Sequence, residues 1–172
     1  MKRLIRSLIK EEAKQVGTLY HFTNLYNLLF ILEEDSLKSR NDWVSFTRNK
    51  NFAKIDRILP GGDINCILII NGDSLSNNYK IEPYHDQKFF RERDFGTDKM
   101  EQEEKVLGPI SPIKSYIENI ILLKNEIKNW EIQNIYYKQN GENVPREDSD
   151  KYSIEDIKNY IQNTYGINVN IE

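Results

Sequence analysis

Residues 18–32, TLYHFTNLYNLLFIL, join a strand pattern to a helix pattern and decide the fold. Residues 18–23 are predicted to form a short strand, and Gly17 separates it from the apolar positions before it. Asn24 belongs to the residue types that cap helix N-termini. The apolar positions after it follow the i, i+3, i+4, i+7 spacing of one helix face: Leu25, Leu28, Leu29 and Leu32. The chain is therefore expected to pass from a strand into a packed helix at Asn24.

Further strands are predicted in the middle of the chain. Residues 43–47 form one, and residues 64–70 are a continuous apolar run, typical of a strand buried on both faces. Shorter patterns predict strands over residues 79–83, 101–107 and 117–123.

Helices are predicted at the two ends of the chain. Apolar residues recur at helical spacing within residues 1–16, and residues 126–139 are also expected to be helical. Ser153 and Asp156 form a capping-box pattern that begins a last helix, and Gly166 ends it. Helices at the ends with strands between them favour an α+β domain over alternating βαβ units.

Composition and charge exclude several classes of protein. A chain of 172 residues with 38% hydrophobic and 30% charged residues is expected to fold as one domain, residues 1–172. The formal net charge of −3 gives no general attraction to nucleic acid or anionic lipid. Cys66 is the one cysteine, which excludes a disulfide framework and fits a reducing, cytoplasmic compartment. No apolar stretch approaches the roughly 20 residues that span a bilayer, so no membrane partner is expected.

Three places in the sequence stand out as candidates for chemistry. They are His21 with Thr23, Ser45 with Arg48, and the acidic run at residues 101–104. The motifs follow one another in a fixed order: Tyr-His-Phe-Thr before an amphipathic helix, Ser-Phe-Thr-Arg at a strand end, and Glu-x-Glu before Lys-Val. In this order and spacing the chain resembles the ADP-ribosyltransferase family. The start is similar to DarT-type and PARP-type members, and the Glu-x-Glu pair to the arginine-modifying toxins. Small bacteriophage proteins have a similar layout.

The resemblance implies a split β-sandwich core with flanking helices. The resemblance covers residues 19–123, which would form an NAD-binding core. The N-terminal helix, residues 1–16, and a C-terminal helical extension, residues 126–172, lie outside the resemblance. NAD would be the substrate. No metal is expected, since two histidines and one cysteine without matching spacing do not make a metal site.

The resemblance assigns catalysis to the two alternate glutamates. Glu103 would stabilise the positive charge that develops on the ribose as the nicotinamide bond breaks, and Glu101 would orient or deprotonate the attacking group. Alternation along a strand puts Glu101 and Glu103 on one face and Glu104 on the other. The alternative is a solvated acidic edge of a sheet, which would be favoured without the resemblance.

The remaining motif residues would bind NAD. His21 would donate a hydrogen bond to a ribose hydroxyl, the backbone around Phe22 would hold the nicotinamide carboxamide, and Thr23 would support the turn. The alternative for His21 is a ring that is satisfied within its strand.

Two further parts of the NAD site come from later in the chain. Arg48 would pair with the pyrophosphate, and Ser45 lies three residues before it. Tyr84 is a candidate for the ring that stacks on nicotinamide, with core packing as its alternative. A surface ion pair is the alternative for Arg48.

The resulting hypothesis is an enzyme that transfers one ADP-ribose from NAD to a macromolecule and releases nicotinamide. The Glu-x-Glu pair and the isoelectric point of about 5.6 favour protein over DNA as the acceptor. An NAD glycohydrolase, with water as the acceptor, is a second hypothesis. A third is a non-catalytic, phage-type inhibitor of a host defence component that keeps the fold. The location would be the cytoplasm of a bacterium or of a phage-infected host cell.

Overall fold

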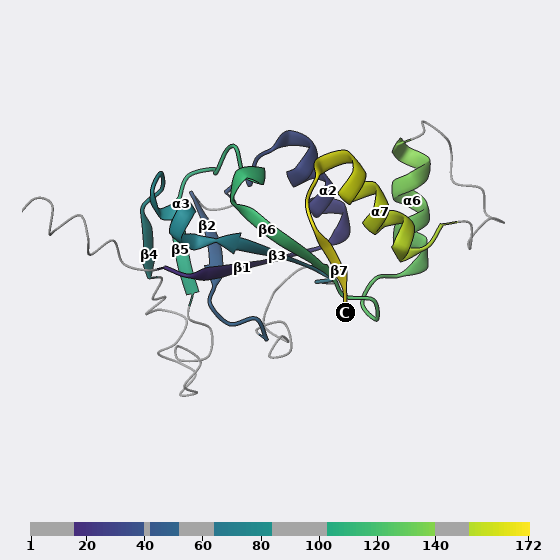
Figure 1. Cartoon of the computed structure of the whole chain (residues 1–172), viewed down its shortest axis with the longest axis horizontal. Helices are drawn as coiled ribbons and strands as arrows, with labels where there is room; N and C mark the ends of the chain where they lie inside the picture. Colours follow the sequence, from purple (N-terminus) through teal and green to yellow (C-terminus); the bar gives the residue numbers. More distant parts are fainter. Residues whose placement is uncertain (1–15, 40–41, 52–63, 84–102, 140–151) are drawn as a thin grey trace, which may run out of the picture.

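The computed structural model describes residues 16–39, 42–51, 64–83, 103–139 and 152–172. They form an α+β fold in which seven strands make one sheet and helices cover it (Figure 1). The strands are β1 (Thr18–Thr23), β2 (Trp43–Thr47), β3 (Cys66–Asn71), β4 (Ile81–Pro83), β5 (Glu103–Leu107), β6 (Ile117–Leu122) and β7 (Val169–Ile171). The helices are α2 (Leu25–Glu34), α3 (Gly72–Ser76), the 3₁₀ turn η2 (Lys114–Tyr116), α6 (Asn129–Gln139) and α7 (Ile154–Tyr165). The predicted α+β class is confirmed.

The sheet is divided into two parts that meet at a narrow junction. Its strand order is β4-β5-β2-β1-β3-β6-β7, antiparallel throughout except for the parallel pair β6 and β7. β1 pairs with β3 along all six of its residues, and β2 pairs with β5 along all five of its own. Between β1 and β2 the register has a single pair, Tyr20 opposite Thr47. The sheet is therefore split between β1 and β2.

Helix α2 begins where the sequence predicted. The Asn24 side chain accepts a hydrogen bond from the Asn27 amide at 2.8 Å, as a helix N-cap does. A second asparagine, Asn65, lies just before β3 and holds the same helix end. Asn65 is fully buried, and its Oδ1 accepts from the Leu25 amide at 2.7 Å. The junction of β1 and α2 is thus tied to the start of β3 by a buried polar group.

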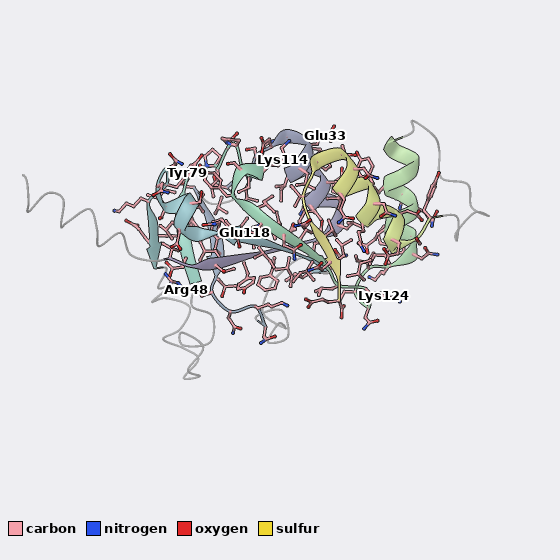
Figure 2. The ribbon with its side chains drawn as sticks, in the orientation of Figure 1. Glu33, Arg48, Tyr79, Lys114, Glu118 and Lys124 are labelled. Atoms are coloured by element: carbon pink, nitrogen blue, oxygen red, sulfur yellow. The ribbon has the colours of Figure 1, made fainter. Side chains whose placement is uncertain are left out.

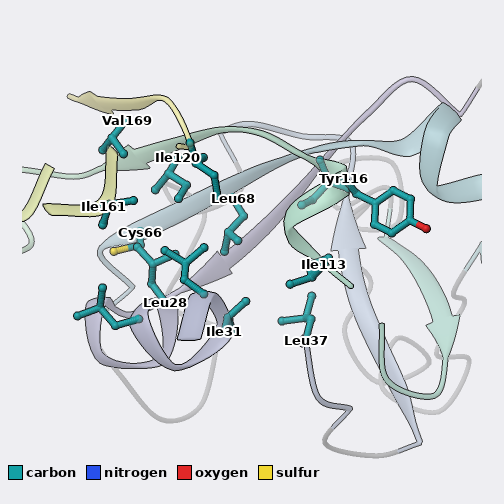
Figure 3. Packing of buried hydrophobic residues seen from close by; sticks show 14 of the residues in the cluster. Leu28, Ile31, Leu37, Cys66, Leu68, Ile113, Tyr116, Ile120, Ile161 and Val169 are labelled. Atoms are coloured by element: carbon teal, nitrogen blue, oxygen red, sulfur yellow. The ribbon is translucent and has the colours of Figure 1, made fainter. Parts of the chain in front are cut away.

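The core lies between α2 and one face of the sheet. Alternate residues of neighbouring strands share that face, among them Leu19, Leu68 and Ile120, all with no exposed surface. Leu28 and Leu32 of α2 are equally buried and belong to the same cluster (Figure 3 shows Leu28 with Leu68 and Ile120). Helices α2 and α6 contact each other, and α7 contacts β7.

The C-terminal region differs from the prediction. The last helix is confirmed with its capping box at Ser153 and Asp156, and Gly166 ends it in the left-handed conformation with φ 68°. After this turn, however, Val169 pairs with Ile120, and the chain ends in strand β7 rather than in a purely helical extension. The short helix α3 was also not predicted. It forms because the Asn71 side chain accepts from the Ser74 amide and caps it. The predicted N-terminal helix lies outside the described residues up to residue 15.

Replacing Asn65 by alanine is expected to destabilise the fold by about 2 kcal/mol, because the Leu25 amide would then be buried without an acceptor. Chemical denaturation followed by circular dichroism measures the free energy of unfolding. Asn27→Ala is the matched control. Asn27 is exposed, and the hydrogen bond from its backbone N–H to Asn24 is kept, so we expect a destabilisation of about 0.5 kcal/mol or less. Equal effects of the two variants would show that the Asn65 side chain does not hold the helix.

Candidate functional site

The three sequence segments singled out above lie on adjacent strands. β1 carries His21, β2 ends just before Arg48, and β5 begins at Glu103, and these strands are neighbours in the order β5-β2-β1. Thr47, the last residue of β2, pairs with Tyr20 on one side and with Glu103 on the other. Segments that are far apart in the sequence therefore meet at the exit of β2.

His21 bridges the split between β1 and β2. Its Nδ1 lies 3.0 Å from the backbone oxygen of Ser45, and its ring packs edge-on against Phe46 with 5.8 Å between centroids. A carbonyl oxygen can only accept a hydrogen bond, so Nδ1 must carry the hydrogen. In the neutral ring, Nε2 is then an acceptor.

Burial keeps this imidazole neutral. Loss of hydration lowers the pKa of His21 below its ordinary value, and the hydrogen bond to the Ser45 carbonyl opposes this effect only in part. The side chain is half-buried. At neutral pH the ring therefore presents a hydrogen-bond acceptor, not a charge.

Arg48 forms an ion pair with Glu104. The Nε of Arg48 donates to Oε1 of Glu104 at 2.8 Å. The Glu104 side chain is 10% exposed and the Arg48 side chain 39%, so the carboxylate sits inside and the guanidinium reaches the surface. Figure 2 shows Arg48 at the end of the molecule that holds β2, β4 and β5.

Glu104 shares a face of the sheet with the ring that supports His21. Glu104 stands directly opposite Phe46 in the pairing of β2 with β5, and cross-strand partners point to the same face. Phe46 in turn contacts His21. A buried carboxylate, an arginine and a neutral imidazole are thus grouped around Phe46.

The other predicted site residues have different positions. Ser45 contributes its carbonyl to His21 and pairs with Lys105 of β5. Phe22 is half-buried, and Thr23 is 8% exposed with its carbonyl bound to the Asn65 amide at 3.2 Å. The backbone of Thr23 therefore ties the end of β1 to the residue before β3, and its role in NAD binding stays a prediction.

Of the remaining predicted residues, the structure describes only the backbone of Glu103, which pairs with Thr47. Glu101 and Tyr84 lie outside the described residues. Their assigned roles stay predictions.

Sequence reasoning missed Glu104. It lies in the acidic run that drew attention, but its partner Arg48 is 56 residues away. The register of β2 against β5, which joins them, leaves no local pattern in the sequence. The only hint in the sequence was that Glu104 directly follows Glu103, the expected catalytic residue.

A metal site, a reactive cysteine and a membrane span were the other features to look for in the described part of the chain. No group of three or more His, Cys, Asp or Glu residues there could hold a metal ion. Cys66 is buried, and burial together with the nearby Glu131 raises the pKa of its thiol, so it acts as a small core residue. No described helix has the length and apolar character needed to span a membrane.

The chain was compared with known families, curated proteins and solved structures. No family model matches the chain, and no curated protein matches it significantly. The solved structure of Thermus sp. 2.9 DarT in complex with carba-NAD+ is similar over 75% of this chain and 93% of that chain, with 14% sequence identity and a TM-score of 0.45.

Because the pKa of His21 is lowered in the folded state, the unfolded chain binds more protons as the pH falls through about 6.5. The contribution of His21 to stability is therefore complete above that pH and is lost below it. We expect the free energy of unfolding of the wild type to fall more steeply between pH 7.5 and 5.5 than that of His21→Gln, by at most about 1.4 kcal/mol per pH unit. Urea denaturation across this range measures both slopes, and identical slopes would contradict the buried, neutral imidazole.

Proposed function

We propose that the protein is an NAD-dependent mono-ADP-ribosyltransferase that modifies a macromolecule and releases nicotinamide. The observation that carries the proposal is the meeting of three motif segments on adjacent strands, with His21 bound to Ser45 and Arg48 bound to Glu104. These are the segments on which the sequence resembles ADP-ribosyltransferases. Their proximity is required for one dinucleotide site.

His21 is suited to a ribose hydroxyl, with the direction of the hydrogen bond reversed from the sequence expectation. Its Nδ1 hydrogen already points at the Ser45 carbonyl, so Nε2 would accept from the hydroxyl instead of donating to it. A sugar hydroxyl can serve as either partner. The interaction therefore survives, and the neutral ring avoids placing a second positive charge beside the cationic nicotinamide.

Arg48 retains the atoms that an anionic pyrophosphate needs. Its Nε is occupied by Glu104, while its two terminal nitrogens make no hydrogen bond with the described residues. These nitrogens can donate to phosphate oxygens in the planar geometry for which the guanidinium is suited. Glu104 would hold the arginine in place for this contact.

Two glutamates compete for the role of the carboxylate beside the reacting ribose. The family resemblance assigns Glu103, with Glu101 as its helper. The described geometry favours Glu104, whose Oε2 accepts no hydrogen bond from the described residues and which shares a face with Phe46 and His21. Either carboxylate would stabilise positive charge on the sugar as the nicotinamide bond breaks.

A protein acceptor fits the charge of the chain better than a nucleic acid does. The formal net charge is −3, and the binding of phosphate backbones depends on basic side chains that release counterions. A protein side chain is thus the proposed acceptor. The proposed place of reaction is the cytoplasm.

The test is nicotinamide release from NAD by the wild type, Glu103→Gln and Glu104→Gln, each with and without cell lysate. Loss of the catalytic carboxylate is expected to reduce release by about 10²–10³-fold, because electrostatic stabilisation of the transition state is lost. The variant that loses nicotinamide release while it still binds NAD identifies the catalytic glutamate. Circular dichroism and NAD binding serve as controls for folding and for the intact site.

Dependence on lysate and label on protein would support transfer. Equal release without lysate, yielding free ADP-ribose, would mean that water is the acceptor. Wild-type rates in both glutamate variants, or no release by the wild type under any condition, would contradict the enzymatic proposal.

A further inference from the structure

Exposed aromatic side chains gather in one region that the proposed site does not use. Four large hydrophobic residues in the described part of the chain are strongly exposed, and three of them border the same pocket. Tyr26 is 51% exposed, Phe30 46% and Trp130 60%. Exposed aromatics grouped in this way are typical of binding surfaces.

The pocket is formed by α2, α6 and α7, which come from distant parts of the sequence. Its volume is about 780 Å³, in the range of pockets that hold small ligands. Two further tyrosines, Tyr160 and Tyr165, belong to its wall and pack edge-to-face with 6.1 Å between centroids. Five aromatic rings thus line one concave surface, which we call the aromatic pocket.

The charge of the aromatic pocket is negative. Two glutamates, Glu33 and Glu131, line it, and no lysine or arginine is among its described lining residues. Glu131 is engaged, since it accepts from Asn65 and from the Lys128 amide. Glu33 is exposed and makes no hydrogen bond or ion pair with the described residues, so its carboxylate is available to a ligand.

Charges of both signs act on Tyr165. Burial raises the pKa of Tyr165 well above its ordinary value, and Tyr160 and the carboxylate of Glu33 raise it further. The same ring also receives a cation from within the protein: Nζ of Lys114 lies 5.5 Å from its centroid, while Lys114 pairs with Asp35 at 3.9 Å. Aromatic rings with a carboxylate nearby are a setting that attracts cations.

We propose that the aromatic pocket docks an arginine side chain presented by a partner protein. A planar guanidinium can stack on an aromatic face and pair with a carboxylate at the same time, which the compact ammonium of lysine does less well. The pocket is larger than one side chain requires, so the residues that flank the arginine would enter with it. This surface is independent of the proposed NAD site, and Figure 2 labels Glu33 and Arg48 well apart.

The test uses a short peptide, acetyl-Gly-Arg-Gly-amide, titrated into the labelled full-length protein. The chain has two tryptophans, so the indole N–H resonance of Trp130 is readily assigned in a nitrogen–proton spectrum with the help of Trp130→Phe. We expect a saturable shift of this resonance. The citrulline peptide, which has the same shape without the charge, is expected to bind about fivefold more weakly.

Matched variants separate the pocket from general charge attraction. Glu33→Gln is expected to weaken binding of the arginine peptide by up to about fivefold, because an exposed ion pair is lost. Glu126→Gln removes the same charge from an exposed glutamate that does not line the pocket, and it is expected to bind as the wild type does. Equal affinity for arginine and citrulline, equal loss in both variants, or no saturable shift of Trp130 would each overturn the proposal.

Discussion

The pairing of Tyr20 with Thr47 is the constraint on which the candidate site depends. It is the single register position that joins β1 to β2, and so the two parts of the sheet, in the described structure. Because the ladder has no further pair between these strands, the imidazole of His21 can reach the Ser45 carbonyl across the split. Thr47 also pairs with the start of β5, so one residue brings the exit of β2, the middle of β1 and the start of β5 together.

The polar side chains beside this junction form hydrogen bonds with other protein groups. Glu104 is largely buried, and a buried carboxylate is costly unless it is paired, so its bond to Arg48 offsets part of that cost. Asn65, buried at the start of β3, plays the corresponding structural role for α2. The site is therefore built on rigid strands whose polar ends are already oriented before any ligand binds.

The sequence predicted the elements that depend on local patterns. Asn24 and Ser153 were recognised as helix caps because capping needs only nearby residues, and the strand over residues 43–47 has the predicted limits. Strand β7 was missed because its three residues gain stability from pairing with β6 rather than from their own pattern. The partnership of Arg48 with Glu104 was missed for a related reason, since it follows from a cross-strand register between distant segments. The protonation of His21 likewise depends on a carbonyl of another strand, so the direction of its hydrogen bond could not be read from Tyr-His-Phe-Thr.

The central claim is that the exit of β2, the middle of β1 and the start of β5 form one dinucleotide site, and NAD affinity tests it most directly. Calorimetric titration should compare the wild type with Arg48→Ala and with Lys50→Ala, a control that removes an exposed cation from the same turn. The account predicts that Arg48→Ala weakens NAD binding by about 10-fold or more, as expected for the loss of charged hydrogen bonds, while Lys50→Ala stays within about twofold of the wild type. Equal dissociation constants for all three proteins, or no NAD binding by the wild type, would contradict it.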